Sequence, residues 1–287
     1  MIWLLVLAGL YLIVLVAIAW FSLHPFRIPI FLSPGGLGSP QEDIQFQASD
    51  GVVLKGWWVE APNPKAVAVL AHGYMMNRSE LTPLAPLLAS KGISSLLLDF
   101  RAHGKSGGKK SFLGCREAGD VKAAVEYARS RAPRAKVLLM GSSMGAAASA
   151  LAVGEHLGLA DALVMDSGYS RLSNAVIGWW RFLGGPFLAT ALWPTAIIAT
   201  PFAGFNPFSV DVSKALSKAG PLPVLFFHGD KDTLALPSEA ERNQAACHGP
   251  TKLVWLPGCG HSEGRWIHPA LYNQELIAFL EEYVRGR

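Results

Sequence analysis

The residues Gly-Ser-Ser-Met-Gly at 141–145 constrain the fold more than any other stretch of this sequence. They follow an apolar segment at 136–140 and precede an alanine-rich one at 146–152. Glycines two residues before and after a serine are typical of a sharp turn from a strand into a helix, where neighbouring segments approach too closely for larger side chains. The pattern places Ser143 at the turn and Ser142 at the variable position. Ser143 is therefore a candidate nucleophile.

Strand-like and helix-like segments alternate along the chain. Strands are predicted at 52–61, 66–73, 94–100, 136–141, 162–167, 223–228 and 252–257; helices are predicted at 79–92, with Ser79 as N-cap, at 117–132, from 144 onward and at 269–285. This alternation predicts an α/β fold with a mostly parallel, doubly wound sheet in one domain, residues 51–287. Residues 171–220 interrupt it after the sixth core strand, and their length and apolar character favour a small helical lid.

An unbroken apolar run without a charged residue extends from Ile2 to Phe21. About 20 such residues span a bilayer core, so residues 1–21 are predicted to be a transmembrane anchor that takes no part in catalysis. A cleaved signal peptide is the alternative, but the run is long and lacks a basic n-region. Residues 22–50, rich in proline and glycine, are predicted to be a linker. We expect a single-pass protein of the cell membrane, with the side of the catalytic domain left open.

Charge and cysteine usage exclude two classes of function. The net charge is +4, but the basic residues are scattered rather than gathered in a stripe with aromatic residues, so we expect no nucleic-acid partner. Cys115, Cys247 and Cys259 match neither a metal-binding pattern nor a disulfide framework. We expect no metal and no organic cofactor.

A nucleophilic serine needs a base, and the base needs an acid that orients it. After a strand–serine–helix turn of this kind, the order along the chain is serine, acid, histidine. His261 lies in a glycine-rich loop just after the last predicted strand, at the sheet edge where ligands bind in such folds. His261 is therefore the predicted base, and His268 is the alternative.

The acid has two candidate positions. Asp232 lies in the loop after the strand at 223–228, two residues beyond Asp230, and is predicted to reach across to the imidazole. Asp166 ends the preceding strand and is the alternative; as a structural residue it would cap the turn into the lid.

Donors to a developing oxyanion are the last requirement of such a site. The backbone N–H of Met144, next to the serine, is the first predicted donor. The backbone N–H of Tyr74, in the loop after the strand at 66–73, is the second, and the Tyr74 hydroxyl is a further candidate.

Six segments in the expected order carry a resemblance to a known family: DGVVLKGWW, AHGYMMNRSE, LLLDFRAHGKSGG, GSSMGA, HGDKDTLALP and PGCGHSEG. Over roughly residues 45–285 the chain resembles the α/β-hydrolase superfamily, specifically the bacterial membrane-anchored hydrolases near the serine aminopeptidase and dienelactone hydrolase branches. The resemblance implies the α/β-hydrolase fold and a Ser-His-Asp triad. The chain departs from the family at Ala102 and Ala146, where glycine is common, and both changes are small.

These features predict a serine hydrolase that cleaves small-molecule carboxylic esters through an acyl-enzyme. Ser143 would attack the carbonyl, His261 would move the proton, and Asp232 would orient the imidazole. The apolar lid is expected to set the preferred acyl length, with Trp179 and Trp180 lining the acyl site. The N-terminal helix would contact the lipid bilayer.

Two other functions remain open from the sequence. An aminopeptidase-like amidase would need an acidic residue facing the pocket to hold a substrate amine, and the lid contains only Asp211. A catalytically inactive, membrane-anchored binding protein is the second alternative, which the full set of candidate catalytic residues disfavours.

Overall fold

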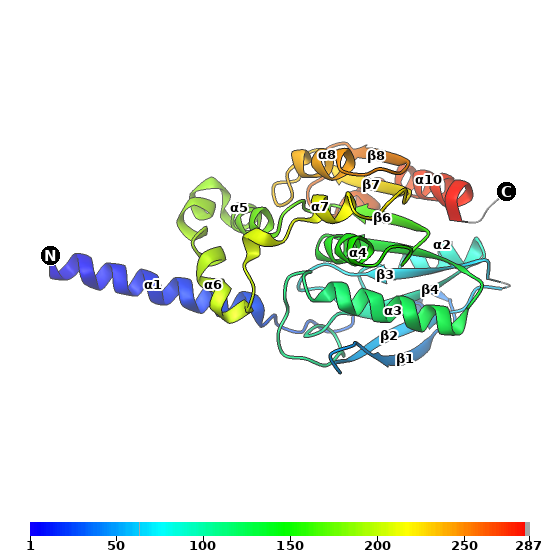
Figure 1. Cartoon of the computed structure of the whole chain (residues 1–287), viewed down its shortest axis with the longest axis horizontal. Coiled ribbons are helices and arrows are strands. Elements are labelled where there is room, and N and C mark those ends of the chain that lie inside the picture. The colour runs from blue at the N-terminus through cyan, green and yellow to red at the C-terminus, as the bar shows by residue number, and fades with distance from the viewer. Residues whose placement is uncertain (63, 285–287) are drawn as a thin grey trace.

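The computed structural model describes residues 1–62 and 64–284, which form a sheet covered by helices and a long N-terminal helix that projects from it (Figure 1). Within these residues the sheet has eight strands in the order β1-β2-β4-β3-β5-β6-β7-β8. β2 pairs antiparallel with β1 and β4, and the other pairings are parallel. The strands are β1 (Glu42–Gln47), β2 (Val53–Val59), β3 (Ala66–Ala71), β4 (Ile93–Asp99), β5 (Lys136–Ser142), β6 (Ala162–Asp166), β7 (Val224–Gly229) and β8 (Thr251–Leu256).

Helices cover both faces of this sheet. The central strands β3, β4, β6 and β7 are therefore buried along their whole length. α3 (Glu117–Arg131) and α4 (Met144–Glu155) pack on one face, with α7 (Val212–Leu216) beyond them. α2 (Leu84–Ser90) and α10 (Pro269–Phe279) pack on the other. The remaining helical segments near the sheet are η1 (Gly35–Leu37), α8 (Pro237–Ala245), α9 (Gly264–Ile267) and η3 (Leu280–Val284). The predicted α/β architecture is confirmed.

Two segments differ from their predicted structure. The helix predicted from Ser79 begins only at Leu84, because turns precede it. The Ser79 hydroxyl instead accepts backbone N–H groups of residues 31 and 32, at 3.3 and 3.4 Å. Residues 22–50, predicted to be a linker, contain β1, and Arg27 donates to four backbone carbonyls of residues 103–108. Residue 285, the end of the last predicted helix, lies outside the described residues.

The segment after β6 folds into helices, as the lid prediction requires. α5 (Leu172–Leu192) is broken at Gly184 and Gly185, and α6 (Thr195–Ala203) follows at an angle of 83°. A short turn, η2 (Pro207–Ser209), then leads to α7. α5 and α6 stand away from the sheet and beside the N-terminal helix α1 (Ile2–Leu23) (Figure 1).

α1 is long and apolar enough to cross a membrane, and most of it is exposed. Its buried side chains, Leu15, Ala19 and Leu23, are spaced four residues apart and so share one helix face. That face packs against the lid helices and the domain below them. The helix predicted to be a membrane anchor therefore also packs against the rest of the protein.

Candidate active site

Ser143 lies on the turn between β5 and α4 with a left-handed backbone φ of 50°. A Cβ on Gly141 would lie 2.3 Å from the backbone nitrogen of Ala146, and a Cβ on Gly145 would lie 2.1 Å from the carbonyl oxygen of Ala71. Both distances are far below van der Waals contact, so only glycine fits at either position. The two glycines therefore permit the close packing around a strained serine.

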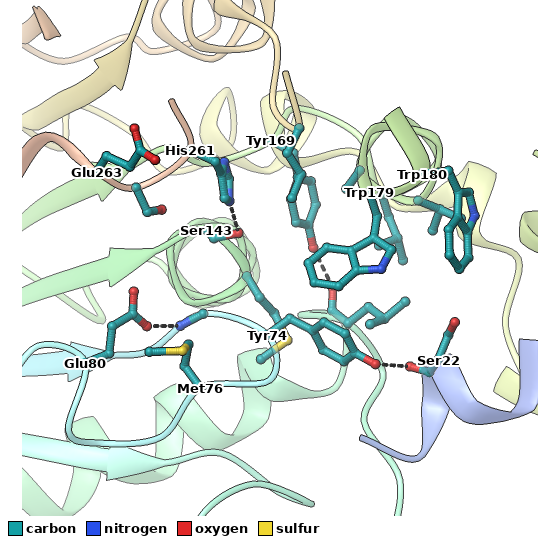
Figure 2. Close-up of a pocket in the computed structure, with 18 of the residues that line it drawn as sticks. Ser22, Tyr74, Met76, Glu80, Ser143, Tyr169, Trp179, Trp180, His261 and Glu263 are labelled. Atoms are coloured by element: carbon teal, nitrogen blue, oxygen red, sulfur yellow. Dashed lines mark hydrogen bonds between the residues drawn. The ribbon is translucent and has the colours of Figure 1, made fainter. Parts of the chain in front are cut away.

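Ser143 is in hydrogen-bond contact with His261, and His261 is in contact with Asp232. His261 Nε2 lies 2.7 Å from Ser143 Oγ (Figure 2), and its Nδ1 lies 2.8 Å from Asp232 Oδ2. The other oxygen of Asp232 accepts the backbone N–H groups of Leu234 and Ala235, each at 2.9 Å. Since Asp232 is buried, these two bonds hold its carboxylate in one orientation. The three side chains form one continuous chain of hydrogen bonds.

The alternative acid and base lie elsewhere. Asp166 accepts hydrogen bonds from Arg265 at 2.7 Å and from the hydroxyl of Tyr272 at 3.1 Å. His268 Nε2 contacts the carbonyl oxygen of Pro257 at 2.8 Å. Ser142 is fully buried, and its hydroxyl donates to Glu80 at 2.7 Å. Each of these residues already has a structural partner.

The loop after β3 passes next to Ser143. A Cβ on Gly73 would lie 3.6 Å from the Cβ of Ser143, so the backbone that leads into Tyr74 runs beside the nucleophile position. The N–H of Met144, the first residue of α4, is at the other side of the same turn. The Tyr74 hydroxyl, considered above as a further donor, instead donates to the carbonyl oxygen of Ser22 at 2.9 Å and points away from Ser143 (Figure 2). Of the donors predicted for the developing oxyanion, only the backbone N–H groups of Met144 and Tyr74 therefore remain candidates.

Two buried histidines support this loop. His103 Nε2 accepts the N–H of Met75 at 3.3 Å, and its Nδ1 contacts the carbonyl oxygen of Arg101 at 2.8 Å. His72 Nε2 accepts the N–H of Phe100 at 3.0 Å. Burial lowers the pKa of His103 to about 3 and lowers that of His72 as well. Both rings are therefore neutral at neutral pH, where they act as fixed hydrogen-bonding groups.

A buried ionic network beneath the loop was not predicted from the sequence. Glu80 Oε2 accepts the N–H of Gly73 at 2.6 Å (Figure 2), and its other oxygen pairs with the guanidinium of Arg265. Arg265 also pairs with Asp166. The positive charge of Arg265 and the bond from Gly73 lower the pKa of Glu80, although burial opposes them. The only sequence signal was that Glu80 ends one of the segments quoted for the resemblance, AHGYMMNRSE, and that Arg265 directly follows another, PGCGHSEG.

A cavity of about 380 Å³ opens from Ser143 and His261 toward α1. Its lining is mainly apolar and includes Trp179 and Trp180 of the lid, the two predicted substrate-binding residues. Trp179 packs edge-on against Tyr74, with ring centroids 5.6 Å apart. Ser22 of α1 lines the far end of the cavity (Figure 2), so the helix that contains the predicted anchor also forms part of the cavity wall. Among residues 1–62 and 64–284, no cluster of three side chains could hold a metal ion.

Comparisons with known proteins agree with this architecture. A protein-family model described as serine aminopeptidase, S33, matches residues 62–203. An esterase from Pyrococcus furiosus superposes with a TM-score of 0.76 and 25% identity, over 92% of this chain and 99% of the esterase.

Curated sequences are similar over most of their length. The uncharacterized protein YfhR of Salmonella typhimurium is 26% identical over 291 residues, which is 96% of this chain and 95% of the relative. The α/β hydrolase domain-containing protein WAV2 of Arabidopsis thaliana is 22% identical over 268 residues, 88% of this chain and 82% of the relative. Fold and comparisons together indicate an enzyme of the hydrolase class.

Proposed function

Because this chain belongs to the α/β-hydrolase superfamily, we propose that it is a serine esterase that forms an acyl-enzyme on Ser143. The observation that carries this proposal is the chain of hydrogen bonds from Asp232 through His261 to Ser143, at 2.8 and 2.7 Å. A serine hydroxyl is a weak nucleophile until a neighbouring base accepts its proton. The contact with His261 supplies that base at the required distance.

The proton moves between Ser143 and His261 in each half of the reaction. Nε2 accepts the hydroxyl proton as Oγ bonds to the ester carbonyl, and the imidazolium then gives this proton to the departing alcohol. Water then attacks the acyl-enzyme while His261 accepts the proton of the water. The imidazolium returns this proton to Ser143 Oγ as the carboxylic acid leaves. Asp232 accepts a hydrogen bond from the Nδ1–H of His261 throughout, which keeps Nε2 free to accept the serine proton and stabilises the imidazolium charge.

Backbone N–H groups stabilise the negative charge on the substrate oxygen. Met144, at the N-terminus of α4, supplies one group, and Tyr74, in the loop beside Ser143, supplies the other. Glu80 holds this loop in place through the N–H of Gly73. Glu80 is thus a positioning residue, since its carboxylate bonds the loop and the guanidinium beneath it rather than the substrate.

The acyl chain occupies the apolar part of the cavity between Ser143 and α1. Trp179 and Trp180 line this part, and Trp180 is fixed by a hydrogen bond of 3.0 Å from its indole N–H to the hydroxyl of Thr195. An apolar cavity binds each methylene group of a substrate favourably, by about 0.8 kcal/mol when burial is complete. We therefore propose that the lid sets the preferred acyl length.

We also propose that α1 is retained as a membrane anchor rather than cleaved. Its C-terminal half supports the domain: Ser22 receives the Tyr74 hydroxyl, and the carbonyl oxygen of Leu23 accepts the N–H of Ser111 at 2.8 Å. Removal of the helix would open one wall of the cavity and uncover the apolar lid residues that Leu15 contacts. A signal peptide, which is removed, has no reason to complete a substrate cavity.

An aminopeptidase is the second candidate, favoured by the description of the family model and by one carboxylate. Glu263 is exposed at the edge of the cavity, two residues after His261, where a substrate ammonium group could reach it. Asp211, the acid considered from the sequence, instead pairs with Arg171 and bonds the N–H of Lys214. The apolar cavity beyond Ser143 favours the esterase.

A direct test compares two substrate series on the full-length protein in detergent micelles. p-Nitrophenyl esters from acetate to palmitate should be cleaved, and aminoacyl p-nitroanilides should be cleaved far more slowly. The Ser143→Ala protein should lose both activities. Faster cleavage of the anilides, reduced by Glu263→Gln, would favour the aminopeptidase, and ester cleavage that survives in Ser143→Ala would overturn the proposed mechanism.

A further inference from the structure

α1 and the lid helices are in contact along the outer part of the molecule. Leu15 of α1 belongs to one apolar cluster with Trp180 and Leu192 of α5. The hydroxyl of Tyr11, one turn nearer the N-terminus of α1, donates to the carbonyl oxygen of Ala191. α6 runs along the same stretch of α1 (Figure 1). The lid therefore extends along α1 and away from the sheet.

The height of this contact can be compared with a bilayer. From Tyr11 to Leu23, at the domain end of α1, a helix rises by about 18 Å, at about 1.5 Å per residue. The hydrocarbon core of a bilayer is about 30 Å thick. If α1 crosses that core, the α5–α6 segment beside Tyr11 lies within the leaflet next to the catalytic domain.

The composition of the lid suits that position. Residues 182–209 contain no Asp, Glu, Lys or Arg. Large apolar side chains point outward from this segment, among them Phe187, 82% exposed, and Ile197, 51% exposed. The other exposed ones in residues 182–209 are Phe182, Leu183, Trp193 and Phe208. A soluble protein rarely exposes so large a continuous apolar surface without a partner.

The threonine hydroxyls of residues 182–209 form hydrogen bonds within this segment. The hydroxyls of Thr190, Thr195 and Thr200 donate to backbone carbonyl oxygens three or four residues earlier, at 2.6 to 3.4 Å. Two basic side chains bind at the edge of the charge-free segment 182–209: Arg181, just before it on α5, donates to the carbonyl oxygen of Thr233, and Lys110 donates to that of Phe202. Internal hydrogen bonds in the middle and charges only at the edge are what a hydrocarbon environment requires.

From these contacts we infer that α5 and α6 are embedded in the leaflet beside α1, and that the enzyme takes its substrate from that leaflet. The cavity ends at Ser22 of α1 and Trp180 of α5, so its end remote from Ser143 is walled by the two elements that lie in lipid. The substrate class is a membrane lipid with an ester-linked acyl chain, which enters along α1 toward Ser143. This assignment of substrate rests on the proposed esterase function.

Fluorescence quenching tests the embedding without reference to catalysis. The full-length protein, with its three cysteines replaced by alanine, receives one new cysteine at Phe187→Cys, Ile197→Cys or Leu157→Cys. Each protein is labelled with an environment-sensitive fluorophore and reconstituted into phosphatidylcholine nanodiscs with doxyl-labelled acyl chains. Leu157 is the matched control because it is 73% exposed and lies after α4, at the opposite edge of the sheet from Ser143. Quenching at 187 and 197 but not at 157 supports the inference.

Equal quenching at all three positions, or none at 187 and 197, overturns the embedding. A second copy of the chain that covers the exposed lid residues would also prevent quenching at 187 and 197, because it would exclude lipid from them. A cooperative thermal unfolding transition near that of the wild-type protein confirms that each unlabelled variant has folded.

A second experiment tests the route of the substrate. In nanodiscs, wild-type protein should cleave 4-methylumbelliferyl oleate dissolved in the bilayer as well as soluble 4-methylumbelliferyl acetate. The double variant Phe187→Glu/Ile197→Glu should lose about tenfold or more of the oleate activity, because charged side chains oppose insertion of the lid, and should keep its acetate activity. Leu157→Glu should change neither activity.

Three results separate this inference from the proposed function. If wild type cleaves acetate but not the oleate ester, the lipid substrate is wrong and the esterase proposal stands. If the double variant cleaves both esters as wild type does, access from the leaflet is wrong. If wild type cleaves neither ester, the esterase proposal fails and the lipid substrate with it, while the quenching result alone decides the embedding.

Discussion

Replacing Asp232 by asparagine tests the arrangement at Ser143 most directly, because the structure dictates how the new amide must lie. One oxygen of Asp232 accepts two backbone N–H groups, from Leu234 and Ala235, and the other faces His261. In Asp232→Asn the amide oxygen has to take the place between the two N–H groups. The amide NH₂ group then faces His261 Nδ1.

The alternative amide orientation would place NH₂ against two buried N–H donors. It would lose two hydrogen bonds, each worth about 1 kcal/mol, so the first orientation is favoured at least about thirtyfold. Nδ1 of His261 must then accept a hydrogen bond instead of donating one, so it carries no proton and the ring proton lies on Nε2, which faces Ser143. A ring protonated at Nε2 cannot accept the serine proton. We therefore expect kcat to fall by about 10³ or more, since the same replacement of a triad aspartate lowers kcat by about 10⁴.

The assay is the steady-state hydrolysis of p-nitrophenyl butyrate by purified full-length protein. KM should change little, and thermal unfolding should stay near that of wild type, because the substitution conserves volume. The matched control is Asp230→Asn, two residues away, whose exposed carboxylate only accepts the N–H of Gly258 at 2.7 Å. That variant should keep its activity within about twofold.

An Asp232→Asn protein with more than about a tenth of wild-type kcat would refute this reasoning, since the wrong tautomer leaves no base for Ser143. If Asp166→Asn were crippled instead while its thermal unfolding stayed unchanged, the acid would be Asp166. The proposed reaction would be unchanged, but Asp166 rather than Asp232 would orient His261.

Four further predictions concern the same region. A fluorophosphonate probe should label the wild-type protein and the Ser142→Ala variant but not Ser143→Ala, and labelling of the last would exclude this nucleophile. For p-nitrophenyl esters, kcat/KM should rise about fourfold per methylene group from acetyl to hexanoyl or octanoyl, and Trp179→Ala should flatten the rise; a maximum at acetate that this variant leaves unchanged would make the lid only a cover. Glu80→Gln should lower kcat about tenfold with little change in KM, because the loop it holds carries an oxyanion donor, whereas a change in thermal stability alone would make it purely structural. The pKa of His103 is about 3 in the fold and near 6.5 in an unfolded chain, so the unfolded state binds more protons between these values and stability should fall as pH decreases from about 6.5 toward 3; His103→Gln should reduce the slope of the urea midpoint against pH, and an unchanged slope would contradict this account.

The sequence by itself determined the features that depend on a few neighbouring residues. Gly141 and Gly145 indicate the turn at Ser143, because both positions have room only for glycine and the two glycines lie within five residues of sequence. The alternation of apolar strands and helices determined the parallel sheet, since each buried strand needs apolar residues along its length. The parallel sheet in turn explains why the loop with His261 could be expected beside Ser143.

Only the tertiary structure decided between residues that local rules treat alike. Asp166 and Asp232 both follow neighbouring parallel strands, and the path of each loop places one against Arg265 and the other against His261. β1 was missed because a short edge strand is buried on one side only, so its apolar pattern is weak. A linker rich in proline and glycine around it concealed the pattern further.

The same limit applies to contacts between distant parts of the chain. Glu80 and Arg265 are 185 residues apart, and their ion pair exists only because the loop after β3 and the loop after β8 meet at one edge of the sheet. Tyr11 and Ala191 are 180 residues apart, and nothing in either segment signals that the N-terminal helix lies against the lid. Local sequence specifies the conformation of a segment, whereas partners across the fold are set by the free energy of packing the whole chain, to which every segment contributes.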